Sequence, residues 1–193
     1  MTERTMKERI LDGVEQCFEI NGVQKTTLQD VADQVGVSRM TVYRHFKDRQ
    51  SLFDGAVLRN ISHHWRLISA RLSDIERLDE WLIEALTIYQ LELCQDPSVK
   101  LYDRLNAYDQ GFIVALSKPG LAVISDKFQP LFDALATDNR LANGLDKNDL
   151  AEWVHRLNFS LLKHPSPRFL QEQPLRRWLA AQLSDGLIPS TKT

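Results

Sequence analysis

The sequence predicts an all-α fold of about nine helices. Apolar residues recur every three or four positions along most of the 193-residue chain, which is the periodicity of a helix with one buried face. No stretch alternates apolar and polar residues as a half-buried strand does. Short polar breaks at 118–120, 138–144 and 164–167 hold much of the proline, glycine and asparagine. We expect a small three-helix domain at 1–50 and a larger helical domain at 51–193.

The first predicted helix ends in a glycine stop signal. Its apolar face consists of Met6, Ile10, Val14, Cys17 and Phe18. Gly22 followed by the apolar Val23 is typical of a helix C-terminus. We expect this helix to cover the two that follow.

A helix-turn-helix is predicted between residues 27 and 46. Thr27 can cap the first of its helices, with Thr26 and Gln29 as a possible capping box. The apolar face of this helix consists of Leu28, Val31, Ala32 and Val35. Gly36 then ends the helix and Ser38 caps a second one, from Arg39 to about His45. The small Ala32 suits a close helix crossing.

The second helix of this motif carries side chains that suit a DNA major groove. Val42 and Phe46 are expected to face inward, which leaves Arg39, Thr41 and Arg44 on the other side. Arginine can bind guanine with two hydrogen bonds, and other donors can hold phosphates. The predicted DNA-binding residues are Thr27, Gln29, Ser38, Arg39, Met40, Thr41, Tyr43, Arg44, His45, Lys47 and Arg49. The alternative is a helical hairpin with a solvated basic face.

The positive charge is local. The net charge of the whole chain is −2. From Ser38 to Gln50, four arginines or lysines stand against the single acid Asp48. This pattern favours a small docking surface for double-stranded DNA over general polyanion binding.

The spacing of these residues closely resembles a family signature. Gly36, Val37 and Ser38 are followed at fixed intervals by Thr41, Tyr43, His45, Phe46, Arg49 and Leu52, as in the TetR family of bacterial regulators. The family usually has lysine where this chain has Arg49, and either cation can hold a phosphate. The resemblance is strong over residues 5–55. It implies a ligand pocket among the middle helices and a dimeric four-helix bundle formed by the last two.

A long helix should link the two domains. Asp48 can cap a helix that runs to about Leu72 and carries Trp65 in its far half. Beyond Asp74, the pattern predicts helices at 77–95, 98–116, 120–140, 146–163 and 174–186. Pro130 should kink or split the third of these.

The middle helices carry many aromatic side chains. The residues predicted to bind a ligand are Trp65, Tyr89, Tyr102, Tyr108, Phe112 and Phe128. The three tyrosines suit a mostly apolar ligand with one or two polar contacts. The alternative is that these rings only fill the core.

The apolar faces of the last two helices are wider than one neighbour requires. The residues predicted to form a homodimer interface are Leu150, Trp153, Val154, Leu157, Leu161, Trp178, Leu179 and Leu183. The alternative is that both helices close the core of their own domain.

The sequence gives little support for an enzyme, a metal site or a cofactor site. His63 and His64 are adjacent on a helix and point about 100° apart, while His155 and His164 lie in different segments. We expect surface or capping histidines, no metal and no cofactor. No GxSxG, P-loop or GxGxxG motif occurs. Cys17 and Cys94 fit no metal or disulfide pattern and should be buried thiols.

The predicted protein is a cytoplasmic, homodimeric transcriptional regulator. The charged N-terminus is unlike a signal peptide, and no run of 18 apolar residues occurs. We expect a repressor that leaves a palindromic operator when a small, largely apolar effector binds, and no membrane partner. The alternatives are an activator of the same family, or a helical binding protein or enzyme with an unused helix-turn-helix.

Overall fold

The computed structural model describes residues 5–137 and 144–183, and these residues form ten α-helices and two short 3-10 segments. The α-helices are α1 (Met6–Asn21), α2 (Leu28–Val35), α3 (Arg39–His45), α4 (Arg49–Arg71), α5 (Leu78–Leu91), α6 (Pro97–Arg104), α7 (Tyr108–Ala115), α8 (Lys118–Thr137), α9 (Lys147–Lys163) and α10 (Glu172–Gln182). The 3-10 segments are Leu93–Gln95 and Pro167–Leu170. The all-α prediction is confirmed, with one more α-helix than expected.

Local capping signals set the ends of the first four helices. Gly22 and Gly36 follow α1 and α2 with positive φ angles of 78° and 72°, a region that glycine enters without steric cost. The hydroxyl of Ser38 accepts the Thr41 amide at the start of α3, at 3.1 Å. Asp48 forms a capping box at the start of α4. These four predictions are confirmed.

The predicted capping box between Thr26 and Gln29 is wrong. The box at the start of α2 joins Thr27 to Asp30, whose amide and carboxylate bond reciprocally with the Thr27 hydroxyl and amide. Thr26 is buried instead, and its hydroxyl donates to the carbonyls of Cys17 and Gly22. The hydroxyl therefore fixes the loop between α1 and α2 to the end of α1.

The larger half differs from the prediction in several breaks. The helix expected at 98–116 is two helices, α6 and α7, because the chain turns at Asn106 with a φ of 52°. The next turn lies at 116–117 rather than 118–120, and α8 runs through Pro130 without being split. The segment 77–95 is α5 followed by a 3-10 turn. The predicted helix ends at 138–140 and 184–186 lie outside the described residues.

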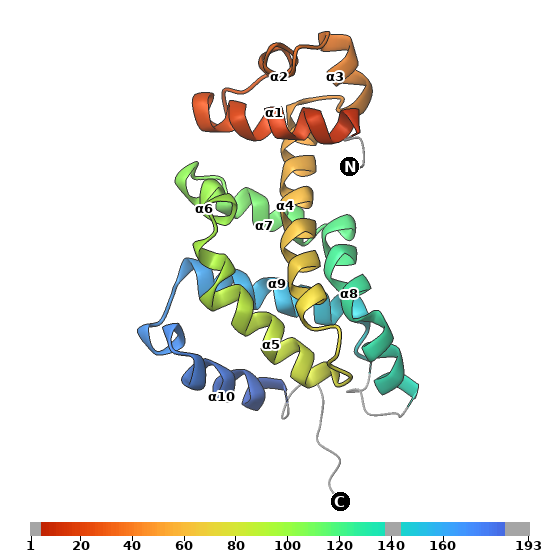
Figure 1. The fold of residues 1–193 in the computed structure, drawn as a ribbon, viewed down its shortest axis with the longest axis vertical. Coiled ribbons are helices and arrows are strands. Elements are labelled where there is room, and N and C mark those ends of the chain that lie inside the picture. Colours follow the sequence, from red (N-terminus) through yellow and green to blue (C-terminus); the bar gives the residue numbers. More distant parts are fainter. Residues whose placement is uncertain (1–4, 138–143, 184–193) are drawn as a thin grey trace, which may run out of the picture.

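Helix α4 runs from the small unit of α1–α3 into the larger group of helices (Figure 1), and it contributes to two hydrophobic cores. The first lies under α1–α3 and includes Phe18, Phe53 and Val57. The second lies among α4, α5, α8, α9 and α10 and includes Trp65 and Trp81. Because α4 contributes to both cores, it connects the small unit mechanically to the larger one. The division of the chain at residue 50 stays a prediction.

Helices α6 and α7 also contribute to the first core. The ring of Phe53 on α4 lies 6.1 Å from Phe18 on α1 and 6.0 Å from Tyr102 on α6. Ala107 and Val114 are buried in the same cluster. The core beneath the helix-turn-helix is therefore closed partly by residues more than forty positions further along the chain.

Candidate functional site

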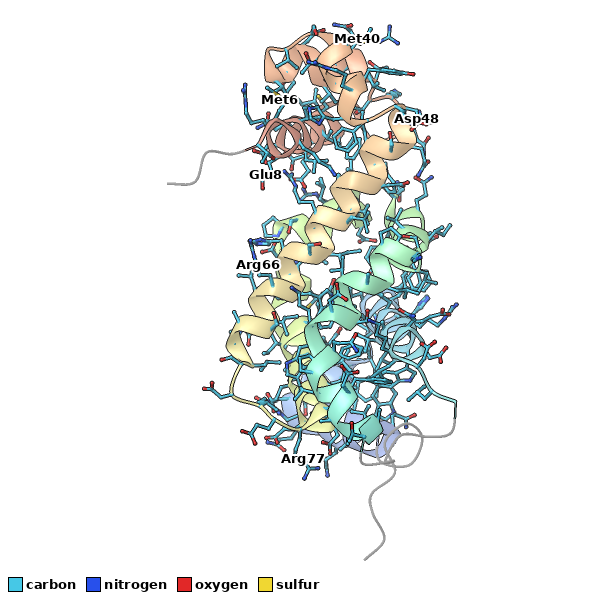
Figure 2. All side chains as sticks on the ribbon, turned by 90° about the vertical axis from the view of Figure 1, so that its right-hand side faces the viewer. Met6, Glu8, Met40, Asp48, Arg66 and Arg77 are labelled. Carbon is cyan, nitrogen blue, oxygen red and sulfur yellow. The ribbon has the colours of Figure 1, made fainter. Side chains whose placement is uncertain are left out.

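Helix α3 presents its side chains at the end of the molecule furthest from α5 and α10. Met40 lies at that extremity in Figure 2, and 66% of it is exposed, as is 52% of Tyr43. Arg39 and Arg44 are also exposed, whereas Val42 and Phe46 are buried. The helix is thus anchored by its apolar side and open on the side that holds the predicted base contacts.

Two glycines allow the helices behind α3 to approach closely. A Cβ atom on Gly13 of α1 would lie 2.4 Å from Cγ2 of Val35 on α2. A Cβ on Gly55 of α4 would lie 2.6 Å from the Phe46 ring. Sequence reasoning identified the small Ala32, which is fully buried, but missed both glycines. An isolated glycine within a helical pattern was the available signal.

Some of the predicted DNA-binding residues are already bonded within the chain. Gln29 donates to the Asp33 carboxylate at 2.8 Å, and Thr27 caps α2. The Arg49 guanidinium donates to the Gln24 carbonyl in the loop between α1 and α2. Arg49 therefore also fixes α4 to that loop. Contact between these side chains and DNA stays a prediction.

The aromatic residues of the middle helices line a partly open cavity of about 80 Å³. Its walls come from α4, α5, α6, α7 and α9. Five of the six predicted ligand-binding residues line it, namely Trp65, Tyr89, Tyr102, Tyr108 and Phe112. Phe128 does not, because it is fully buried in the second core with its ring 6.1 Å from that of Trp81. That these residues bind a ligand stays a prediction.

The cavity also has polar lining residues that sequence reasoning missed: Asn60, His155 and Asn158. Asn158 follows Leu150 and Val154 on the buried face of α9, and a polar residue in that series was the available signal. The hydroxyl of Tyr102 and Oδ1 of Asn158 are buried and have no hydrogen-bond partner in the described structure. Such atoms are rare in native proteins and are usually bonded to water or a ligand.

All titratable groups of the cavity are held in their uncharged forms. Burial lowers the pKa of His155 to about 4, although its Nε2 lies 3.4 Å from the Gly120 carbonyl oxygen. Burial raises the pKa of Tyr89, Tyr102 and Tyr108 well above the usual value. At neutral pH these groups offer hydrogen bonds without net charge.

The prediction of surface histidines is wrong for two of them. His64 is 1% exposed and His155 is 7% exposed. His64 Nε2 lies 3.1 Å from the Ser98 hydroxyl, and burial is the main reason that its pKa is lowered. His63 and His164 are exposed, as expected. Within the described residues, no group of histidines, cysteines and acids could hold a metal ion.

Most of the predicted dimer residues lie inside the chain's own core. Five of them are 0–4% exposed: Leu150, Val154, Leu161, Leu179 and Leu183. These five side chains are not accessible to a partner chain. For them the structure favours the alternative that the last two helices pack into the core of their own domain. Trp153, Leu157 and Trp178 are only partly buried against that core. Among the described helices, none is long and apolar enough to cross a membrane.

Comparison with known proteins identifies the N-terminal unit. The family model described as "Bacterial regulatory proteins, tetR family" matches residues 10–56. Two similar proteins are the HTH-type transcriptional repressors AcnR of Corynebacterium glutamicum and Corynebacterium diphtheriae, 28% identical over 123 residues and 31% over 109. The matches cover 58% and 51% of this chain and 64% and 56% of the relatives, so the chain spans less than two thirds of the length of either.

The fold extends this likeness over the remaining helices. The solved structure of the TetR family repressor AlkX from a Dietzia species has a TM-score of 0.63 at 18% identity, over 93% of this chain and 96% of that one. At this identity the likeness concerns the fold alone. The family match covers the helix-turn-helix that the exposed α3 completes. The helix-turn-helix unit of this chain, residues 10–56, belongs to the TetR family of bacterial regulatory proteins.

Proposed function

We propose that this protein is a homodimeric transcriptional repressor that binds a palindromic operator and leaves it when a small, largely apolar effector binds. The two AcnR relatives are named as repressors, and AlkX is described as a repressor implicated in the biodegradation of n-alkanes. Residues 1–50 would bind DNA, and residues 51–193 would bind the effector and the second protomer. The family is one of regulators, and no catalytic role is proposed.

The observation that carries the proposal is the exposed polar side of α3. Arg39 and Arg44 lie on a helix of major-groove size, with Thr41 between them. A single such helix makes only a few phosphate contacts, so specific affinity at physiological salt requires a second half-site. Two-fold symmetry would place the second α3 about 34–36 Å away, one turn of duplex further along.

The partly buried apolar residues of the last two helices are the best candidates for the dimer interface. Trp153 and Leu157 lie on α9, and Trp178 lies on α10. The Trp178 ring is 4.7 Å from that of Phe169, which makes an aromatic patch. Large half-buried rings of this kind are enriched in interfaces.

Selection from a random pool of duplexes would test the proposal. The purified protein should enrich a palindrome, and binding should weaken as salt rises. Arg44→Ala should weaken the enrichment, whereas Arg177→Ala, which removes an exposed arginine from α10, should leave it unchanged. Failure of the unaltered protein to enrich any duplex, or equal enrichment by both variants, would overturn the proposed function.

A further inference from the structure

We propose that the occupant of the cavity among α4, α5, α6, α7 and α9 is an uncharged aromatic compound that carries a hydroxyl or amide group. This inference rests on the proposed function, because it names the chemical class of the effector. The hydrogen-bonding group would be held between Tyr102 and Asn158, and the ring would lie among the aromatic walls.

The first argument is that the cavity lining has no charged side chain that could pair with a charged ligand. Within the described structure, no arginine, lysine, aspartate or glutamate lines the cavity. Its histidine and tyrosines are neutral at pH 7 because burial disfavours their charged forms. A charged ligand would lose its hydration and gain no ion pair in return, which is strongly unfavourable. The cavity therefore selects against anions and cations.

The second argument is the pair of buried polar atoms without partners. Oδ1 of Asn158 is an acceptor, and the Tyr102 hydroxyl can donate or accept. The cavity volume of about 80 Å³ has room for a few water molecules, since each needs roughly 10–15 Å³. A ligand that displaces this water must reproduce its hydrogen bonds. The ligand therefore needs a donor for Asn158 and a group that bonds to Tyr102.

The third argument is the arrangement of the rings. The Phe159 ring lies 4.1 Å from that of Phe112 and 5.1 Å from that of Tyr108, and Tyr89 stacks on Trp65 at 5.9 Å. Flat, polarisable walls suit an aromatic ring, which gains from stacked and edge-on contacts. These contacts favour an aromatic ligand over an aliphatic one.

Room for a ring can come from Tyr108. An adjacent surface cleft of about 340 Å³ shares Val99, Tyr108 and Leu162 with the cavity. Tyr108 is only half-buried, and Lys163 lies over its ring at 5.6 Å. Rotation of this side chain would join the two spaces, and the charged residues Lys100, Asp103 and Lys163 line the cleft but not the cavity. A single-ring ligand then fits where the cavity by itself, smaller than the roughly 150 Å³ that holds benzene elsewhere, does not admit it.

Four probes of similar size would test the assignment by calorimetry at pH 7, without DNA. They are 4-methylphenol, 1,4-dimethylbenzene, 4-methylbenzoate and 4-methylbenzylammonium. We expect 4-methylphenol to bind at least a hundredfold more tightly than either ion. Equal affinity for either ion, or no binding of 4-methylphenol up to its solubility, would overturn the inference.

Two variants test the polar contacts. Asn158→Leu and Tyr102→Phe should each reduce the preference for 4-methylphenol over 1,4-dimethylbenzene about tenfold. Asn148→Leu makes the same change as Asn158→Leu at an exposed position and should leave the preference unchanged. If neither cavity variant changes it, the contacts are wrongly assigned.

Thermal unfolding of the free variants distinguishes a ligand contact from a structural one. Oδ1 of Asn158 has no hydrogen-bond partner among residues 5–137 and 144–183, so Asn158→Leu should unfold at the same temperature as the unaltered protein or higher. A marked fall would mean that the amide supports the fold, and would overturn its assignment to the ligand. All these readouts omit DNA. Probe selectivity without any enriched duplex would therefore refute the proposed function and leave the ligand class standing.

Discussion

Arg39 and Arg44 of α3 differ from Tyr43 in the part of the DNA that we expect them to contact. An arginine that contacts a base edge contributes to specificity, whereas a hydroxyl on a phosphate does not. We expect Arg39→Ala or Arg44→Ala to cost roughly 1–3 kcal/mol on the selected site and to relax preference at particular base pairs. Tyr43→Phe should weaken all duplexes alike. Titrations over a set of mutated operators decide this, and uniform losses for all three variants would contradict it.

His155 should make stability depend on pH. Its pKa is about 4 in the folded protein against about 6.5 when unfolded. The unfolded chain therefore binds more protons between these values, and stability falls as the pH drops through that window. We expect about 2 kcal/mol of His155-dependent loss between pH 7 and pH 5, where the unfolded histidine is largely protonated.

Urea unfolding at the two pH values measures this loss. His155→Gln keeps an N–H donor for the Gly120 carbonyl and removes the titration, so it should flatten the profile. His164→Gln removes an exposed histidine and should leave the slope unchanged. The prediction fails if the two variants have the same profile. The pKa of His64 is also lowered. Any pH dependence that remains in His155→Gln is therefore assigned to His64.

At the scale of elements, the crossing of α1 and α2 depends on Gly13. Alanine there would place a methyl group 2.4 Å from the stiff Val35 side chain. Overpacking of this kind costs about 1–3 kcal/mol, which exceeds the gain of up to about 1 kcal/mol in helix propensity. We expect Gly13→Ala to lower the free energy of unfolding.

Gly111 of α7 provides the matched control. A Cβ atom there meets only Val57, at 3.8 Å, which is ordinary contact. Gly111→Ala should therefore be neutral or stabilising by up to about 1 kcal/mol. The denaturant midpoint of Gly13→Ala should be lower than that of the unaltered protein, and the midpoint of Gly111→Ala should be equal to it or higher. A stabilising Gly13→Ala would show that α1 and α2 can separate freely.

The elements that sequence predicted well are those fixed by neighbours in the chain. Gly36, Ser38 and Asp48 act on backbone groups within four residues, so their roles could be read from the sequence alone. The break at Asn106 and the start of α8 before Gly120 depend on packing between distant helices. The roles of Phe128 and His155 depend on it too. An apolar or aromatic helix face looks the same in sequence whether it meets a core, a cavity or a partner.

At the scale of the whole molecule, the dimer seam can be tested with charged substitutions. Trp153→Glu or Trp178→Glu would bury an unpaired carboxylate twice in a two-fold interface. We expect monomers that lose the palindromic operator. Ile113→Glu, at a 70% exposed position of α7, should remain dimeric. Sedimentation gives the oligomeric state, and dimers in both tryptophan variants would place the seam elsewhere.

Leu179→Glu is not a test of the same interface. Leu179 is fully buried in the second core, so a carboxylate there would destabilise the protomer itself. Any loss of dimers in Leu179→Glu would therefore follow from unfolding of the protomer and would not locate the interface.

Effector and operator should compete through α4. One end of this helix holds Arg49 at the α1–α2 loop, and Trp65 in its other half lines the cavity. Coupling of about 1–3 kcal/mol is typical, and linkage requires each ligand to weaken the other by the same factor. Calorimetry of 4-methylphenol with and without the selected duplex measures it. Identical affinities would show that the cavity does not control DNA binding.

The shared position of Tyr102 limits how this protein can be divided or recombined. Tyr102 lines the cavity and also packs against Phe53 in the core beneath the helix-turn-helix. A fragment cut after α4 would expose Phe53 and Val57, which α6 and α7 otherwise cover. A fusion of this helix-turn-helix unit to another sensor domain must therefore include α6 and α7. Otherwise the apolar surface that their removal uncovers has to be redesigned.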